Sequence, residues 1–172
     1  GAISGSTFGL TKNGSGTLIL GGVNTYNGTT TINAGTLSVT GNSSASTHTV
    51  SSGAFLGGTG VVGATTVNGT LQGTLTTAGL TVNSGGIVSP NATGSVGTLN
   101  ASTITINGGS GYNFTIANVT TSVAGTDYDQ IVGSGALTFN NTSGSPFTIY
   151  LYGTPTGWSS TGTVSHTHLR AH

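Results

Sequence analysis

Residues 10–39 read LTKNGSGTLILGGVNTYNGTTTINAGTLSV, and they decide the fold because short strand-like segments alternate with turn residues. The segments 17–20, 29–32 and 36–39 combine Thr with Leu, Ile and Val, and Gly and Asn lie between them. Such short runs, bounded by Gly, Asn or Ser, are typical of strands joined by turns. We therefore expect strands here rather than helices.

The same pattern continues through most of the chain. Helix signals are almost absent, because the sequence has no Glu and no stretch in which apolar residues recur at three-to-four spacing. The fold class is therefore predicted to be all-β. Further strand-like segments occur at 66–71, 80–82, 102–106, 112–116, 136–139 and 147–152.

A turn motif recurs along the first half of the chain, at Gly16, Gly35, Gly53, Gly69 and Gly85, with gaps of 19, 18, 16 and 16 residues. A period in this range predicts a parallel β-solenoid, in which each coil stacks on the coil before it. We expect about eight to ten coils, each rising about 4.8 Å. Outward Thr hydroxyls are expected to form ladders between coils, and Asn residues to stack at matching turns.

The repeat divides the chain into two regions. We expect residues 1–110 to form solenoid repeats of about 16–19 residues. Residues 111–172 are expected to add C-terminal coils and a more aromatic cap or interface segment. The interior of a narrow solenoid admits alternate aliphatic side chains. The expected core residues are Leu18, Leu20, Ile32, Leu37, Val39, Leu56, Val67, Leu71, Leu80, Val82, Leu99, Ile104 and Ile106.

Charge is nearly absent, since Lys12, Asp127, Asp129 and Arg170 are the only charged residues and the net charge is zero. The chain therefore offers no basic patch for nucleic acid and no cationic face for anionic lipid. No apolar run approaches the length of about 18 residues that a membrane span needs, so no membrane insertion is expected. The absence of Cys excludes disulfides and thiolate metal sites. We expect no cofactor.

Residues 10–39 resemble the passenger-associated repeat of bacterial autotransporters. That family's pattern is Leu-x-Lys-x-Gly-x-Gly-Thr-Leu, then Asn-x-Tyr-x-Gly-x-Thr, then Gly-Thr-Leu. Residues 57–99 are similar to a linker of the same family, with Asn91 where Gly is usual, and 127–132 (DYDQIV) are similar to a further step of it. The matching positions in 10–39 are Leu10, Lys12, Gly14, Gly16, Thr17, Leu18, Asn24, Tyr26, Gly28, Thr30, Gly35, Thr36 and Leu37.

The resemblance implies a right-handed parallel β-helix, extracellular or on the surface of a Gram-negative bacterium. The sequence starts at Gly1 without a signal peptide and shows no C-terminal membrane barrel. We therefore expect either a cleaved passenger fragment or similar repeats reused in a secreted fibre.

Three sequence features carry possible chemistry. The segment 58–63 (GTGVVG) has dinucleotide-motif spacing but lacks a following helix, so its glycines are interpreted as turns. Asp127 and Asp129 share one face of an extended segment, about 6–7 Å apart, near the separation of an inverting glycosidase pair. A turn or capping role is favoured for them, with a weak Ca²⁺ site and catalysis as alternatives.

The histidines are the third feature. His166, His168 and His172 lie in a His-x-His-containing terminus that is compatible with a metal, but a loose or interface-forming end is favoured and no metal site is expected. His48 is isolated and is expected on a loop.

We expect no enzyme but a structural protein that self-associates, head-to-tail or laterally, into a surface fibre or matrix. Neither end carries an evident charged cap, and near-zero charge leaves little repulsion against association. A monomeric adhesin passenger is the alternative, with host or matrix glycans as partners. A carbohydrate-active β-helix enzyme and an ice-binding Thr lattice are less favoured, the latter because the coils are unequal in length. The expected self-association interface is Phe147, Tyr150, Tyr152 and Trp158.

Overall fold

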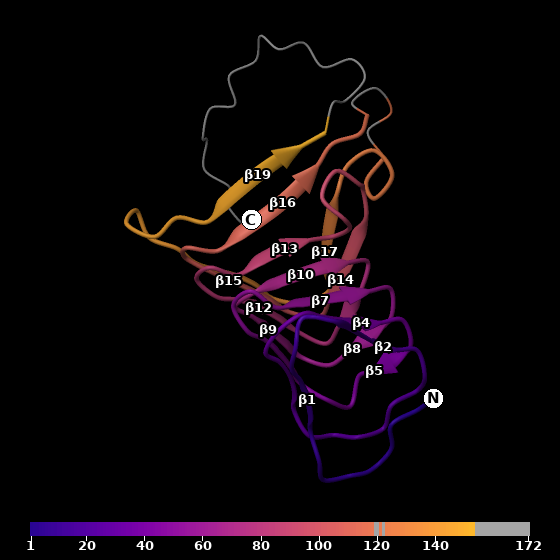
Figure 1. Cartoon of the computed structure of the whole chain (residues 1–172). Coiled ribbons are helices and arrows are strands. Elements are labelled where there is room, and N and C mark those ends of the chain that lie inside the picture. Colours follow the sequence, from indigo (N-terminus) through magenta and orange to yellow (C-terminus); the bar gives the residue numbers. More distant parts are fainter. Residues whose placement is uncertain (119–120, 122, 154–172) are drawn as a thin grey trace.

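A computed structural model describes residues 1–118, 121 and 123–153 of the 172-residue chain. In these residues the chain forms nineteen β-strands and no helix, which confirms the all-β prediction. The strands stack as successive coils from the N-terminal end, indigo in Figure 1, to β19 at the opposite end.

The strands belong to three parallel sheets, called sheets A, B and C below. Sheet A contains β1 (Leu10–Lys12), β3 (Thr30–Ile32), β6 (His48–Val50), β9 (Thr65–Val67), β12 (Leu80–Val82), β15 (Ile104–Asn107) and β18 (Leu137–Asn140). Sheet B contains β2 (Thr17–Leu20), β4 (Thr36–Val39), β7 (Phe55–Gly58), β10 (Thr70–Gly73), β13 (Ile87–Ser89), β16 (Gly111–Thr115) and β19 (Thr148–Tyr152). Sheet C contains β5 (Asn42–Ser43), β8 (Val61–Val62), β11 (Thr76–Thr77), β14 (Thr98–Ala101) and β17 (Gln130–Gly133).

The chain visits the three sheets in turn and pairs each strand with its counterpart in the next coil, which is the arrangement of a parallel β-helix. Two sheets have seven strands each, so the described residues form seven coils, fewer than the expected eight to ten. The expected number refers to all 172 residues, and long coils account for part of the difference. Thr65 pairs with Leu80, 15 residues on, whereas Ile104 pairs with Leu137, 33 residues on.

The two longest insertions leave the solenoid at the same corner. Segment 90–97 lies between β13 and β14, and segment 116–129 between β16 and β17, so both insertions join sheet B to sheet C. The rod therefore widens toward its C-terminal end, as Figure 1 shows. We call the end formed by β17, β18 and β19 the wide end, and the end formed by residues 1–26 the narrow end.

The five repeated glycines lie in the turn that precedes sheet B, as their spacing predicted. Gly35 has a left-handed φ of 67°, which glycine adopts without steric cost. Gly69 is needed for a different reason, since a Cβ there would collide with backbone oxygens of Ser51 and Ala54 in the preceding coil. The turns thus combine unusual backbone angles with close stacking of backbones.

The core is a stack of aliphatic side chains inside the coils. Every expected core residue is buried except Leu18, which is half-buried because it lies in the first coil. The prediction of the core is therefore largely confirmed. The sequence reasoning did not include Tyr26, Val50, Ala54, Val62, Leu75, Val88 and Ala101, which are also buried.

The expected asparagine ladder is present at the turn that follows sheet A. Side-chain amides donate to the Oδ1 of the preceding coil's asparagine at 2.8–3.0 Å in four places. One coil has Ser51 instead, and its hydroxyl reaches the Oδ1 of Asn33 at 3.4 Å. We call this set the asparagine ladder: Asn13, Asn33, Ser51, Asn68, Asn83, Asn107 and Asn140.

Candidate functional site

Asp129 is buried and joins two segments of the backbone. Its Oδ1 accepts a hydrogen bond from the N–H of Gly97 and its Oδ2 one from the N–H of Thr115, both at 2.7 Å. Burial raises the pKa of Asp129, while these backbone bonds oppose the shift. The carboxylate therefore fixes the end of insertion 90–97 against β16.

Asp127 closes the second insertion. Its Oδ2 accepts from the hydroxyl of Thr121 at 2.5 Å and from the N–H of Val123 at 2.7 Å, and these bonds lower the pKa of Asp127. Both carboxylates thus bind nearby backbone and hydroxyl donors, which is the favoured turn and capping role. Within the described residues, no three His, Cys, Asp or Glu side chains gather as metal ligands would.

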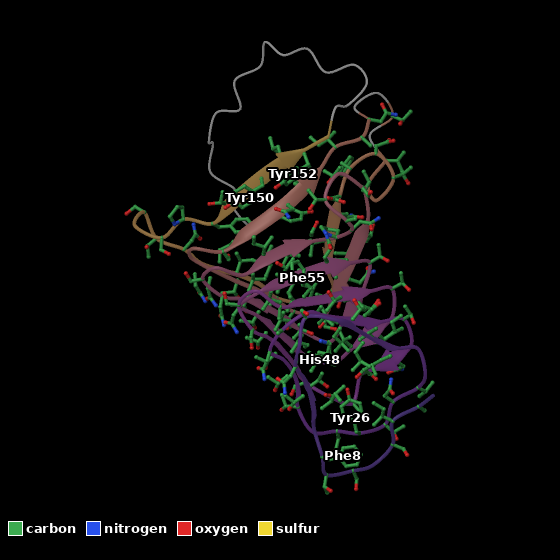
Figure 2. The ribbon with its side chains drawn as sticks, viewed as in Figure 1. Phe8, Tyr26, His48, Phe55, Tyr150 and Tyr152 are labelled. Carbon is green, nitrogen blue, oxygen red and sulfur yellow. The ribbon has the colours of Figure 1, made fainter. Side chains whose placement is uncertain are left out.

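His48 does not lie on a loop, so that expectation is wrong. It begins β6 and points into the solenoid, where only 1% of it is exposed (Figure 2). Neither ring nitrogen has a well-formed hydrogen bond. Burial lowers the pKa of His48 to about 4, and a backbone contact with Ser46 opposes that shift. The ring is therefore neutral at pH 7. The other three histidines lie outside the described residues.

A buried polar network lies beside His48 in the narrow half of the solenoid. The hydroxyl of Tyr26 is 2.7 Å from Thr30 Oγ1 and 3.2 Å from Ser43 Oγ, and Thr30 Oγ1 is 2.7 Å from Ser46 Oγ. The resemblance singled out Tyr26 as a motif position, and nothing in the sequence indicated what it contacts. The network gives these buried hydroxyls partners, so its role is structural.

The narrow end is partly closed by side chains. The ring of Phe8 stacks on that of Tyr26 with centroids 6.3 Å apart (Figure 2). Lys12 is buried, and its Nζ donates to the backbone oxygens of Asn13, Gly14 and Ala34 at 2.7–3.1 Å. The expectation that neither end has a charged cap is therefore wrong at this end, where an ammonium group satisfies three turn carbonyls.

The wide end is open in the described residues. Leu137 and Phe139 pair in register with the buried residues Ile104 and Ile106. Leu137 and Phe139 themselves are 50% and 38% exposed. Ile149 and Leu151 of β19 are likewise 42% and 49% exposed. Their exposure follows from their place in the last described coil. Core positions of this coil thus present an apolar surface: Leu137, Phe139, Ile149 and Leu151.

The expected interface residues differ in their exposure. Phe147 is half-buried, packs against the core and places its ring 6.0 Å from that of Phe139. Tyr150 and Tyr152 are exposed on β19, where Figure 2 shows them. Trp158 lies outside the described residues.

The outer face of sheet A carries outward threonines, which the sequence predicted in general without locating them or giving their register. The second residue of all seven strands is threonine, and consecutive threonines pair in register. We call this set the threonine column: Thr11, Thr31, Thr49, Thr66, Thr81, Thr105 and Thr138.

Hydroxyl ladders between coils were expected on such a face, and this expectation is wrong for the column. None of its hydroxyls takes part in a hydrogen bond with another described residue, whereas Thr29 and Thr47 beside it form one hydroxyl pair at 3.2 Å. The asparagines supply the inter-coil side-chain bonds instead.

Comparison with known families identifies one repeat. Residues 10–39 match the family model of the passenger-associated-transport-repeat. The match confirms the predicted resemblance to autotransporter passenger repeats. No curated protein and no solved structure gave a match. Among the described residues, no helix has the length and apolar character needed to cross a membrane.

Proposed function

We propose that this passenger-type chain is a structural protein whose solenoids stack head-to-tail into a secreted or cell-surface fibre or matrix. The repeat at residues 10–39 supports the setting, because its family implies a secreted or surface location in Gram-negative bacteria. The open wide end is the observation that carries the proposal. A strand edge with unpaired backbone groups is a template for another chain unless it is covered or blocked.

The two ends of the solenoid have matching core columns. Leu10 begins the column of sheet A that ends at Leu137, and Leu18 begins the column of sheet B that ends at Ile149. Leu10 and Leu18 are half-buried. Stacking the narrow end of one copy on the wide end of the next would place Leu10 over Leu137 and Leu18 over Ile149. Each contact removes apolar surface from water, worth about 25 cal/mol per Å².

The charged groups nearest the two ends are held by internal hydrogen bonds, and the stacking would place Lys12 over Phe139. Asp127 and Asp129 are the charged side chains nearest the wide end in the described residues, and both are held by internal hydrogen bonds. The Lys12 ammonium at the narrow end is held by backbone carbonyls. With zero net charge, copies of the chain repel each other little.

A monomeric adhesin passenger is the second candidate. Tyr150 and Tyr152 favour it, because both are exposed on β19, where host or matrix glycans could reach them. In this case the rod holds a binding surface away from the cell, and its ends need no partner.

Light scattering during size-exclusion chromatography tests the first proposal. The 172-residue protein is expected to form species of increasing mass as its concentration rises. Ile149→Glu places a charge in the proposed contact and should leave monomers. Ile19→Glu is the matched control, because Ile19 is 65% exposed on the outer face of sheet B, and it should associate like the original protein.

Circular dichroism of all three proteins checks that the strands are retained. A monomer at every concentration would contradict self-association and favour the adhesin. Association that Ile149→Glu does not weaken would contradict the proposed end-to-end contact.

A further inference from the structure

The threonine column is continuous over the whole described length of sheet A. Parallel strands lie about 4.8 Å apart, so seven threonines in register span roughly 29 Å. The insertions do not interrupt the column, because segments 90–97 and 116–129 join sheet B to sheet C, and segment 141–147 follows β18, the last strand of the column. The unequal coil lengths, which argue against a regular lattice at the level of the sequence, therefore do not disturb this face.

The hydroxyls of the column are available to an external partner. Buried threonines such as Thr30, Thr65 and Thr77 hydrogen-bond inside the protein. The seven column hydroxyls form no such bond within the part of the chain that the structure describes. Each also carries a methyl group, so the column offers alternating apolar and hydrogen-bonding groups at a fixed spacing.

The residues beside the column keep the face regular and uncharged. On one side the asparagine ladder runs parallel to it, with most of its amides fixed by bonds of 2.8–3.0 Å. On the other side the residue before each strand is Gly, Ala or Thr, none of which is larger than the threonine of the column. The side chain of Lys12, the charged residue of sheet A, points inward. The flanking residues are Gly9, Thr29, Thr47, Ala64, Gly79, Thr103 and Ala136.

From this arrangement we propose that the outer face of sheet A binds ice. A partner of this face must be uncharged, must repeat at nearly the strand spacing, and must exchange hydrogen bonds with hydroxyls. Ordered water meets all three conditions, because water molecules in ice repeat along one axis at nearly that spacing. The hydroxyls hydrogen-bond water molecules of the ice lattice directly, and the methyl groups lie against those waters. Few hydrogen bonds among the waters must therefore be rearranged when the face meets ice.

A crystalline neutral polysaccharide is the competing partner, since it is also regular and uncharged. The face favours ice, because none of the column or flanking residues is aromatic or charged and could hold a sugar ring in a fixed orientation. The inference does not depend on the fibre proposal, since the ends of the solenoid take no part in it.

An ice-partition experiment tests the inference. Ice is grown slowly from a solution of the 172-residue protein and a carrier protein, and the protein content of the ice and of the liquid is compared. The original protein is expected to enter the ice, while the carrier stays in the liquid. Thr66→Tyr puts a bulky ring in the middle of the column and should reduce incorporation to the level of the carrier.

Thr70→Tyr is the matched control, because Thr70 is half-buried and faces outward from sheet B in the same coil. It should enter ice like the original protein. Circular dichroism and thermal unfolding establish that both variants are folded. Exclusion of the original protein from ice would overturn the proposal, as would an equal loss in both folded variants. Retention on cellulose or chitin without entry into ice would also overturn it and assign the face to polysaccharide.

Discussion

Single residues of the core show where sequence reasoning succeeds and where it fails. The sequence pattern correctly predicts that aliphatic residues at alternate strand positions are buried, as Leu37 and Leu56 illustrate. His48 occupies an equivalent inward position between Thr30 and Thr65, yet a lone histidine carries no signal of burial. Lys12 is a similar case, because only the structure reveals that its stem lies inside and its ammonium reaches turn carbonyls. Polar residues at inward positions are thus the ones that alternation alone misplaces.

The burial of His48 predicts a loss of stability in mild acid. Unfolded His48 takes up a proton near its ordinary pKa of 6.5, whereas burial holds the folded pKa to about 4. Between these values the unfolded state binds more protons, so the free energy of unfolding falls as the pH falls from 6.5 to 4. The full effect amounts to roughly 3 kcal/mol. Denaturant unfolding at pH 7 and pH 4.5 measures it.

His48→Leu provides the comparison, because Leu80 occupies the same column. The variant should lack this part of the pH dependence. The raised pKa of Asp129 acts in the opposite direction, but it is present in both proteins and cancels in their difference. Identical pH dependence of the two proteins would show that His48 is not buried as described.

At the scale of the element, one short unit builds sheet A seven times. Each unit has a central threonine and ends in asparagine or, once, serine: LTKN, TTIN, HTVS, TTVN, LTVN, ITIN and LTFN. This unit is present in the sequence, but the glycine turns that precede sheet B recur at a more regular spacing and are therefore the stronger signal of a repeat. The register of the threonine column follows from the pairing of the strands. The sequence does not show this pairing directly, because paired threonines are separated by different numbers of residues from coil to coil.

The one interruption of the asparagine ladder predicts a stabilising substitution. Ser51 reaches Asn33 at 3.4 Å, and no side-chain bond links Ser51 to Asn68 in the next coil. Ser51→Asn should complete the ladder and raise the free energy of unfolding by about 1 kcal/mol, the typical net value of a hydrogen bond. Thermal unfolding measures the change.

Asn83→Ala is the opposite change, because Asn83 bonds both to Asn68 and to Asn107. It should lower the free energy of unfolding by about 1–3 kcal/mol, since partners are left unsatisfied. If Ser51→Asn destabilised the protein, the turn at residue 51 would not share the geometry of the other ladder turns.

At the scale of the whole molecule, composition and repeats predict a neutral parallel β-solenoid, and the structure has this architecture. The sequence did not reveal that residues 90–97 and 116–129 are insertions, because length alone does not distinguish them from additional coils. It also did not predict the difference between the ends. Lys12, Phe8 and Tyr26 partly close the narrow end, whereas Leu137 and Leu151 remain exposed at the wide end.

Electron microscopy of the native protein, without denaturant, tests the central claim most directly. The matching columns at the two ends predict uniform filaments one solenoid wide, lengthening with protein concentration and absent from Ile149→Glu. Short single rods at all concentrations would contradict the stacking of solenoids and would leave the side faces of an isolated rod as the working surface of the protein.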